Sequence, residues 1–167
     1  MVQPMKKLIY IEENFITPEE CQQFIDFAVD NKNETPHGNG DTYSTKVDWK
    51  NHTAIYFGGN VDSTVPSLDN VIVNRVVDIC KSFDPKANLD YVGVVRWPVG
   101  TFMKPHVDDN NVHKPDMFAA MLYLNDDFEG GNTVFHDLVV KPEVGKLIIF
   151  SNSQYLHYVS KVESDER

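Results

Sequence analysis

Cysteine is scarce in this 167-residue chain, which contains only Cys21 and Cys80. Two cysteines cannot build the disulfide framework that is typical of small secreted domains. Both residues lie in segments with helical periodicity, so we expect two buried thiols. The low cysteine content favours a protein of the reducing cytoplasm.

Positive charge and long apolar runs are also lacking. The chain has 15 Lys and Arg residues against 25 Asp and Glu residues, a net charge of -10. This balance argues against sequence-independent binding to nucleic-acid phosphates, and it is compatible with small molecules or with neutral or basic peptides. No apolar run approaches the ~20 residues of a membrane span, and the apolar segment near the start is too short for a signal peptide. We therefore expect no nucleic-acid or membrane partner, and the oligomeric state stays open.

The remaining composition is that of an ordinary globular protein, 41% hydrophobic and 24% charged. A chain of this length can bury one substantial core. No repeat or composition shift marks a domain boundary. We therefore predict a single domain over residues 1–167, with a helical and loop part over about 1–88 and a β-rich core over about 89–167.

Two helices are predicted in the N-terminal part. Thr17 can cap the first helix, Pro18 fits the first helical position, and Glu20 completes a capping box. A second helix is predicted from Ser67 to about Phe83. Its apolar set is Leu68, Val71, Ile72, Val76, Ile79, Cys80 and Phe83.

Short strands separated by turns dominate the C-terminal part. In the N-terminal part, the polar segment Asn31–Asp41, rich in Gly and Asn, is predicted as a loop. Helices first and a run of strands afterwards indicate an α+β protein. We expect a mainly β core that forms a jelly roll, also called a double-stranded β-helix, with supporting N-terminal helices. The predicted strands are 8–11, 53–57, 91–97, 118–124, 132–135, 146–150 and 155–162.

The most informative motif is His106-Val107-Asp108, with His157 well downstream. In a strand, residues i and i+2 point to the same face, so His106 and Asp108 can converge on one ion. Two imidazoles and one carboxylate form the facial ligand set of non-haem Fe(II), with the opposite face open for a co-substrate and oxygen. The resulting net charge of +1 attracts a dianionic chelating co-substrate. The absence of cysteine near the site disfavours structural zinc.

The triplet alone is weak evidence, because a chain of this composition contains about one His-x-acid triplet by chance. A histidine in a strand is more often a core or surface residue than a ligand. His136, which precedes Asp137, is the most credible rival ligand. The remaining histidines with a low expectation of metal binding are His37, His52 and His113.

Five segments over residues 90–167 carry motifs in a fixed order: the strand, Gly turn and Pro-His-x-Asp of 94–108, Tyr-Leu-Asn at 123–125, Gly-Gly-x-Thr-x-Phe at 130–135, the Pro-x-x-Gly-x-Leu segment with its terminal Phe at 142–150, and His-x-Val at 157–159. Together these motifs resemble those of the Fe(II)/2-oxoglutarate dioxygenases of the prolyl 4-hydroxylase type. Arg167 falls ten residues after His157, at the spacing of the family's basic 2-oxoglutarate anchor. The N-terminal half matches only in general form.

The resemblance implies an Fe(II) site at His106, Asp108 and His157, with no further catalytic residue beyond the metal centre. It also implies 2-oxoglutarate and O2 as co-substrates, with ascorbate as a reductant. The implied 2-oxoglutarate contacts are Arg167, whose planar fork suits a carboxylate, the hydroxyl of Tyr123, and Thr133.

Two alternatives and two departures accompany these roles. Lys146 and Lys161 are rival anchors for the co-substrate, although we expect both to be exposed to solvent. Trp97 stands where many relatives carry tyrosine, and Met103 stands where another aromatic residue is common. Both changes could reshape the co-substrate pocket or the substrate entrance. The predicted substrate contacts are Trp97, Tyr43 and Trp49.

The function implied by the resemblance is hydroxylation of a prolyl residue in a peptide or protein, with release of succinate and CO2. The retained Asp108 favours hydroxylation, because related halogenating enzymes carry a small residue there. Three other classes stay open: an oxygenase of a free amino acid or other small molecule, a non-catalytic jelly-roll binding module, and a zinc hydrolase with the same ligands.

Overall fold

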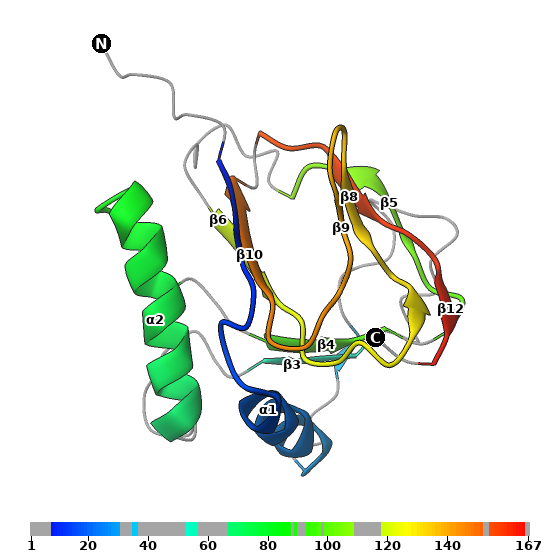
Figure 1. Cartoon of the computed structure of the whole chain (residues 1–167), viewed down its shortest axis with the longest axis horizontal. Coiled ribbons are helices and arrows are strands. Elements are labelled where there is room, and N and C mark those ends of the chain that lie inside the picture. The colour runs from blue at the N-terminus through cyan, green and yellow to red at the C-terminus, as the bar shows by residue number, and fades with distance from the viewer. Residues whose placement is uncertain are drawn as a thin grey trace.

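Two helices and twelve short strands make up the described part of the computed structural model (Figure 1). The described residues are 8–30, 35–36, 53–56, 67–87, 89, 93–97, 99–108, 118–151 and 154–165. The elements are β1 (Ile9–Glu12), α1 (Pro18–Asp30), β2 (Thr35–Pro36), β3 (Thr53–Tyr56), α2 (Ser67–Phe83), β4 (Gly93–Arg96), β5 (Met103–His106), β6 (Phe118–Leu122), β7 (Glu129–Gly130), β8 (Thr133–Phe135), β9 (Val139–Val140), β10 (Leu147–Ser151), β11 (His157–Val159) and β12 (Val162–Ser164).

Both helices begin where the sequence patterns predict. At the start of α1, the Thr17 N–H donates to Glu20 Oε2 at 2.8 Å, and the Glu20 N–H donates to Thr17 Oγ1 at 3.2 Å. The capping box is therefore confirmed. Helix α2 has the predicted bounds and buries Ile72. Val71, predicted in the same apolar set, is 56% exposed, because successive helical residues point about 100° apart. Neither described helix is long and apolar enough to cross a membrane.

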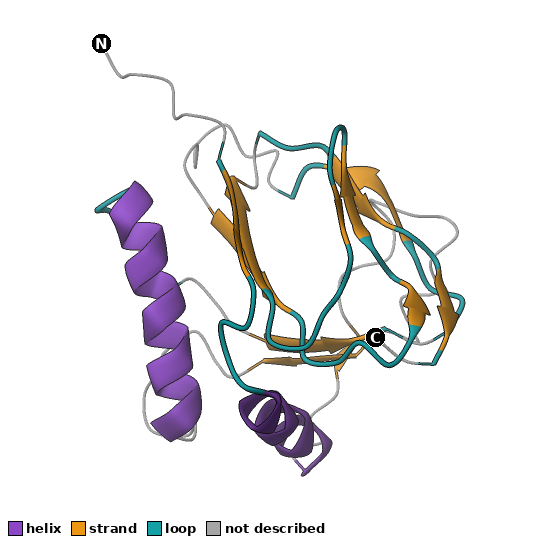
Figure 2. Ribbon diagram, in the orientation of Figure 1, coloured by secondary structure: helices purple, strands orange, loops and turns teal. Residues whose placement is uncertain are grey.

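Two antiparallel sheets form the core, with strand orders β1-β10-β6 and β5-β11-β8-β9. Figure 2 shows the two sheets facing each other, with α2 alongside the first sheet. Strand β10 is the centre of that sheet, and its side chains alternate between two clusters. Leu147 and Ile149 pack with residues of α1 and α2, while Ile148 and Phe150 pack in the interior with Phe135 of the second sheet. The mainly β jelly-roll core with supporting helices is therefore confirmed.

The helices are tied to the core by specific contacts. Cys21 and Cys80 are buried and free, as predicted, and both belong to the cluster between the helices and β10. Arg75 of α2 lies 4.3 Å above the centroid of the Phe15 ring and donates to the Phe15 carbonyl at 2.8 Å. These contacts join α2 to the segment that leads into α1.

Several strands differ from the sequence-based expectations. Thr35–Pro36 lies inside the predicted 31–41 loop but forms β2, which pairs with β3; the rest of that segment lies outside the described residues. The single strand predicted over 155–162 is two strands, because β11 pairs with β5 and β8 while β12 pairs with β7. Strands of two residues, such as β7 and β9, are too short to show an alternating pattern in the sequence.

Candidate metal centre

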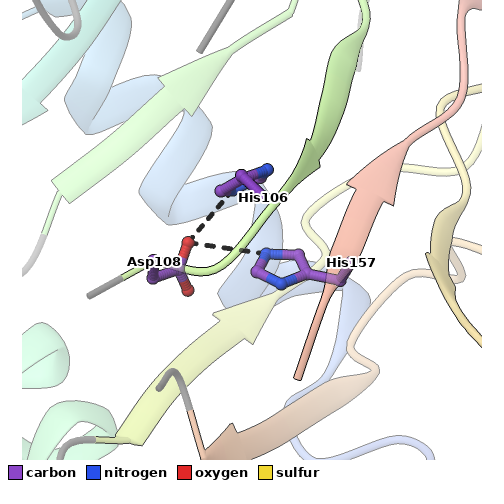
Figure 3. Close-up of side chains that lie close together, drawn as sticks. All are labelled: His106, Asp108 and His157. Carbon is purple, nitrogen blue, oxygen red and sulfur yellow. Dashed lines mark hydrogen bonds and ion pairs between the residues drawn. The ribbon is translucent and has the colours of Figure 1, made fainter. Parts of the chain in front are cut away.

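His106, Asp108 and His157 meet at one end of the four-stranded sheet (Figure 3). Strands β5 and β11 are antiparallel neighbours, and their register places His106 directly opposite His157. Asp108 lies two residues beyond His106, after β5 has ended. The predicted convergence is present, and His106 and His157 lie in different strands as predicted; only Asp108 differs, because the segment after β5 and not the strand itself supplies the carboxylate.

The carboxylate lies between the two imidazoles. Asp108 Oδ1 is 3.1 Å from His106 Nε2 and 3.5 Å from His157 Nε2. One ligating atom from each residue lies within 4.8 Å of the others. The side chains of His106 and His157 are only 6% and 5% exposed, whereas that of Asp108 is 33% exposed. The cluster is therefore closed on the imidazole side and accessible beside the carboxylate.

Backbone carbonyls orient both imidazoles. His106 Nδ1 lies 2.8 Å from the Lys104 carbonyl, and His157 Nδ1 lies 3.1 Å from the Tyr155 carbonyl. A carbonyl can only accept, so each Nδ1 carries a proton and donates it. When the rings are neutral, each Nε2 carries the lone pair that can coordinate a metal ion, and both Nε2 atoms lie beside Asp108.

The charges in the cluster favour a cation. Burial alone raises the pKa of Asp108, but hydrogen bonds and charge from His106 and His157 outweigh it and lower the pKa to about 2. Burial lowers the pKa of His106, but hydrogen bonds to Asp108 and to the Lys104 carbonyl outweigh it and raise the pKa above 6.5. The Asp108 carboxylate is therefore ionised at neutral pH, and its negative charge stabilises a positive charge next to it.

Metal affinity is expected to fall as the pH is lowered through the pKa of His106. A coordinating imidazole must lose its second proton, so metal and proton compete for His106 Nε2. Because this pKa is raised above 6.5, the loss of affinity should begin at a higher pH than for an unperturbed histidine. Asp108 contributes little until the pH approaches about 2. Titration of the protein with Mn(II) at a series of pH values tests this; an affinity that stays constant down to pH 6.5 would contradict it.

The same shifts predict the stability of the metal-free protein. The Asp108 contribution is present above pH 3.8 and lost as the pH falls toward about 2. The His106 contribution is present below pH 6.5 and lost as the pH rises above the raised pKa. The decrease in the free energy of unfolding that Asp108→Asn causes should therefore be largest between pH 3.8 and pH 6.5.

The donor set fits Fe(II). Two imidazole nitrogens and one carboxylate oxygen form the facial set of non-haem iron sites, and the cluster contains no thiolate of the kind that structural zinc sites use. His106, Asp108 and His157 could hold the ion on one face and leave the opposite coordination positions to small molecules. The residues predicted as the metal site are thus brought together in the structure.

Aromatic rings pack around His157, and the sequence interpretation did not include them in the site. The Phe150 ring lies edge-on at a centroid distance of 4.8 Å, and the Phe135 ring lies at 5.7 Å. Phe135 is opposite His157 in the β8–β11 register. Phe135 and Phe150 each close a quoted motif, but no local pattern shows that the rings reach a histidine from another strand.

Tyr123 and Thr133 lie together in the core. The Tyr123 hydroxyl and Thr133 Oγ1 are 2.6 Å apart, and both side chains are buried. Tyr123 shares its apolar cluster with Phe135 and Phe150, the two rings beside His157. The Sγ atom of Cys21 in α1 lies 3.8 Å from the backbone carbonyl oxygen of Tyr123. Two of the three residues implied as 2-oxoglutarate contacts are therefore neighbours.

The rival candidates for the metal ligand and the co-substrate anchor lie outside the cluster or are paired with other side chains. His136 is 92% exposed and contacts Asp137, outside the cluster of three. Lys146 was expected to be exposed, and this is wrong: its side chain is buried, with Nζ 2.9 Å from Glu143 and 3.4 Å from Glu13. Burial is possible because these carboxylates pair the ammonium. Lys161 is exposed, as predicted.

Trp97 is buried in a third apolar cluster with Phe128, Val159 and Val162, against which Met103 packs. A role for Trp97 in substrate binding stays a prediction. Several other predicted residues lie outside the described part of the chain: Arg167, Tyr43, Trp49, His37, His52 and His113.

Comparison with protein families and curated proteins agrees with this donor set. Residues 92–167 match the model of the 2OG-Fe(II) oxygenase superfamily, and this range contains all three residues of the cluster. A probable prolyl 4-hydroxylase 8 of Arabidopsis thaliana is 29% identical over 142 residues. The match covers 75% of this chain and 44% of that protein, so the chain spans less than half the length of this relative.

Solved structures share the fold. The viral collagen prolyl hydroxylase of Paramecium bursaria Chlorella virus-1, in its 2OG complex, has a TM-score of 0.71 at 19% identity, covering 96% of this chain and 91% of that chain. A Pseudomonas putida prolyl-4-hydroxylase has a TM-score of 0.74 at 15% identity, covering 96% and 88%. A Trichoplax adhaerens prolyl hydroxylase, in complex with a peptide fragment of the hypoxia inducible factor oxygen degradation domain, has a TM-score of 0.66 at 16% identity, covering 93% and 78%. Residues 92–167 thus match the 2OG-Fe(II) oxygenase superfamily, and with its jelly-roll core and two-histidine carboxylate cluster this chain is similar to the prolyl 4-hydroxylases of that superfamily.

Proposed function

We propose that this protein is an Fe(II)- and 2-oxoglutarate-dependent dioxygenase that hydroxylates a prolyl residue in a peptide or protein, as a single domain over residues 1–167. The observation that carries the proposal is the cluster of two buried imidazoles and one carboxylate, with ligating atoms within 4.8 Å of one another. This donor set is the facial two-histidine carboxylate set of non-haem Fe(II) oxygenases.

His106, Asp108 and His157 would hold Fe(II). With Fe(II), 2-oxoglutarate and O2 bound, one oxygen atom would enter the substrate C–H bond and the other would enter succinate, with release of CO2. The chain's own contribution is to hold a proton on each Nδ1, which donates to a backbone carbonyl, and to direct both Nε2 atoms toward Asp108. The low pKa of Asp108 keeps the third ligand ionised.

The co-substrate would bind beside the metal, between the sheets. We propose that Tyr123, Thr133 and Arg167 hold the distal carboxylate of 2-oxoglutarate. The Tyr123 and Thr133 hydroxyls already lie together in the interior, and arginine forms a bidentate pair with a carboxylate. With 2-oxoglutarate bound, the Tyr123 and Thr133 hydroxyls would form hydrogen bonds to its carboxylate, and the hydrogen bond between the two hydroxyls would weaken. Ascorbate would serve as the reductant that keeps the iron ferrous.

A prolyl peptide is the favoured substrate. The Arabidopsis relative and the three solved structures are all named as prolyl hydroxylases, and the Trichoplax structure holds a peptide. The net charge of -10 suits a neutral or basic peptide. Trp97, Tyr43 and Trp49 are the proposed substrate contacts. A cytoplasmic location, based on cysteine usage, also stays a prediction.

The proposal is tested with purified protein, Fe(II), 2-oxoglutarate, ascorbate and a panel of prolyl peptides. We expect succinate to form and one peptide to gain one oxygen atom, an increase of about 16 mass units, on a prolyl residue. Succinate formation only with free amino acids or other small molecules would replace the prolyl assignment by the small-molecule alternative. Metal binding without succinate formation on either panel would favour a binding module.

Replacing Tyr123 with phenylalanine is expected to weaken 2-oxoglutarate binding by about 10-fold or more. A hydrogen bond to a charged group contributes roughly 1.5–3 kcal/mol, and the change would also leave the Thr133 hydroxyl without its partner. Isothermal titration of the Mn(II)-loaded protein with 2-oxoglutarate measures the effect. Tyr158→Phe is the control, because this side chain is partly exposed between the buried His157 and Val159. Equal affinities for the two variants would assign the contact to another residue.

A further inference from the structure

Phe150 contacts the metal centre without carrying a ligand atom. Its ring meets the His157 imidazole at a centroid distance of 4.8 Å and an interplanar angle of 66°. We propose that Phe150 is a positioning residue that fixes the orientation of the His157 imidazole for metal binding. The inference rests on the proposed metal site and extends it to a residue outside the ligand set.

The hydrogen bond at Nδ1 does not fix the His157 ring by itself. The bond to the Tyr155 carbonyl, at 3.1 Å, sets the direction of one ring atom and still allows the ring to tilt about that direction. Contacts on the ring surfaces remove this freedom. Phe150 at 4.8 Å and Phe135 at 5.7 Å supply them from the core, and His106 lies at 4.4 Å. Tilt matters because it moves Nε2, the atom that would coordinate.

Phe150 is suited to this task because it is itself immobilised. Its side chain is fully buried, and its ring meets the Phe135 ring edge-on at 5.1 Å. Its backbone lies in the central strand β10, opposite Ile9 of β1 and Ala119 of β6. Phe135 is held in turn by the Tyr155 ring at 5.8 Å. A ligand braced by a rigid strand keeps its geometry better than one braced by a loop.

Phe150 also joins the two halves of the proposed site. It packs against His157 on one side and belongs to the same cluster as Tyr123, the proposed co-substrate contact. A change at Phe150 should therefore disturb ligand orientation even where the fold survives. A residue that only fills the core would affect stability and leave metal affinity unchanged.

The neighbouring residue provides a matched control. Ile149 is also fully buried in β10, but it faces the helices and packs with Cys21 and Ile72. Ile149→Ala removes more core contact than Phe150→Leu, so it is the more stringent test of a purely structural effect. Phe150→Met serves as the second ring-free variant, because the flexible thioether fills irregular space.

The experiment titrates each metal-free variant with Co(II) alone and follows the visible absorption of the bound ion. Thermal unfolding with and without Co(II) gives a second measure of binding, in which the stability of the metal-free variant is subtracted. We expect about three- to tenfold weaker Co(II) binding in Phe150→Leu and Phe150→Met, from the loss of one edge-on ring contact. Ile149→Ala should unfold at a lower temperature and bind Co(II) as the wild type does.

Wild-type Co(II) affinity in both Phe150 variants would overturn the positioning role and leave the proposed function intact. An equal loss of affinity in Ile149→Ala would also overturn it, since the effect would then follow general destabilisation. Failure of the wild-type protein to bind Co(II) at all would overturn both proposals together.

Discussion

Asp108→Ala is expected to abolish metal-dependent 2-oxoglutarate binding and turnover, while Asp137→Ala leaves both unchanged. Among the described residues Asp108 supplies the one carboxylate of the cluster, and its Oδ1 lies within 3.5 Å of both imidazole Nε2 atoms. Loss of an outer-shell partner alone costs about 10- to 100-fold in metal affinity or activity. Loss of a ligand should cost more than about 100-fold.

The control is well matched because Asp137 also contacts a histidine, its neighbour His136. That pair lies on the surface, with side chains 92% and 89% exposed, and it is not part of the cluster. The two substitutions therefore remove the same chemical group from a buried convergent site and from an isolated surface pair.

The readout is Mn(II)-dependent binding of 2-oxoglutarate, followed by succinate formation with Fe(II). Unfolding of the metal-free variants checks that each one is folded. Because Asp108 is one-third exposed, its replacement should leave little cavity. Wild-type binding in Asp108→Ala would remove the proposed triad, and lost binding in Asp137→Ala would restore His136 as a ligand.

Gly145→Ala is expected to lower the free energy of unfolding by about 3 kcal/mol or more, a large single-residue effect. Gly145 has a φ of +78°, and a Cβ placed there would lie 2.2 Å from the Ile16 carbonyl oxygen. The glycine N–H donates to the Tyr123 carbonyl at 2.9 Å, and its own carbonyl accepts from Phe15 N–H at 2.8 Å. The substitution would push the Phe15–Ile16 segment before α1 away from the Gly145 turn, which is hydrogen-bonded to Tyr123.

Gly100→Ala separates conformational strain from the steric clash. Gly100 has a φ of +88°, and a Cβ there would meet nothing within 4 Å. This variant should lose only the roughly 1–2 kcal/mol that a left-handed backbone conformation costs. Urea unfolding of the two variants gives the comparison. Equal losses would mean that the Ile16 carbonyl moves aside without cost. Because of the link to Tyr123, Gly145→Ala should also bind 2-oxoglutarate more weakly than Gly100→Ala.

Local patterns in the sequence predicted several elements correctly because the causes of those elements are local. The capping box at Thr17 and Glu20 closes within one helical turn, so the start of α1 can be read directly from four residues. The bounds of α2 follow from its apolar repeat. The apolar run predicted a strand over 146–150, and β10 forms there over Leu147–Ser151 with all five residues buried.

Other features depend on partners far away along the chain. Thr35–Pro36 forms a strand only because β3 pairs with it, and a two-residue strand carries no pattern of its own. Lys146 was expected at the surface, yet Glu13 and Glu143 from two different segments pair it in a buried position. In both cases a neighbour in space outweighs the local preference of the residue.

The sequence by itself determined the chemical identity of this protein's site: a His-x-Asp triplet, a distal histidine and the ordered motifs that connect them. The types of the ligand residues and their spacing are properties of the sequence, so they can be recognised without the tertiary structure. Only the tertiary structure decided that His106 and His157 are register partners and that Asp108 reaches them from beyond a strand end. It also decided that the Phe150 ring packs against the His157 imidazole and that Tyr123 and Thr133 share a hydrogen bond. These contacts arise from strand pairing and core packing between distant segments, which no local pattern encodes.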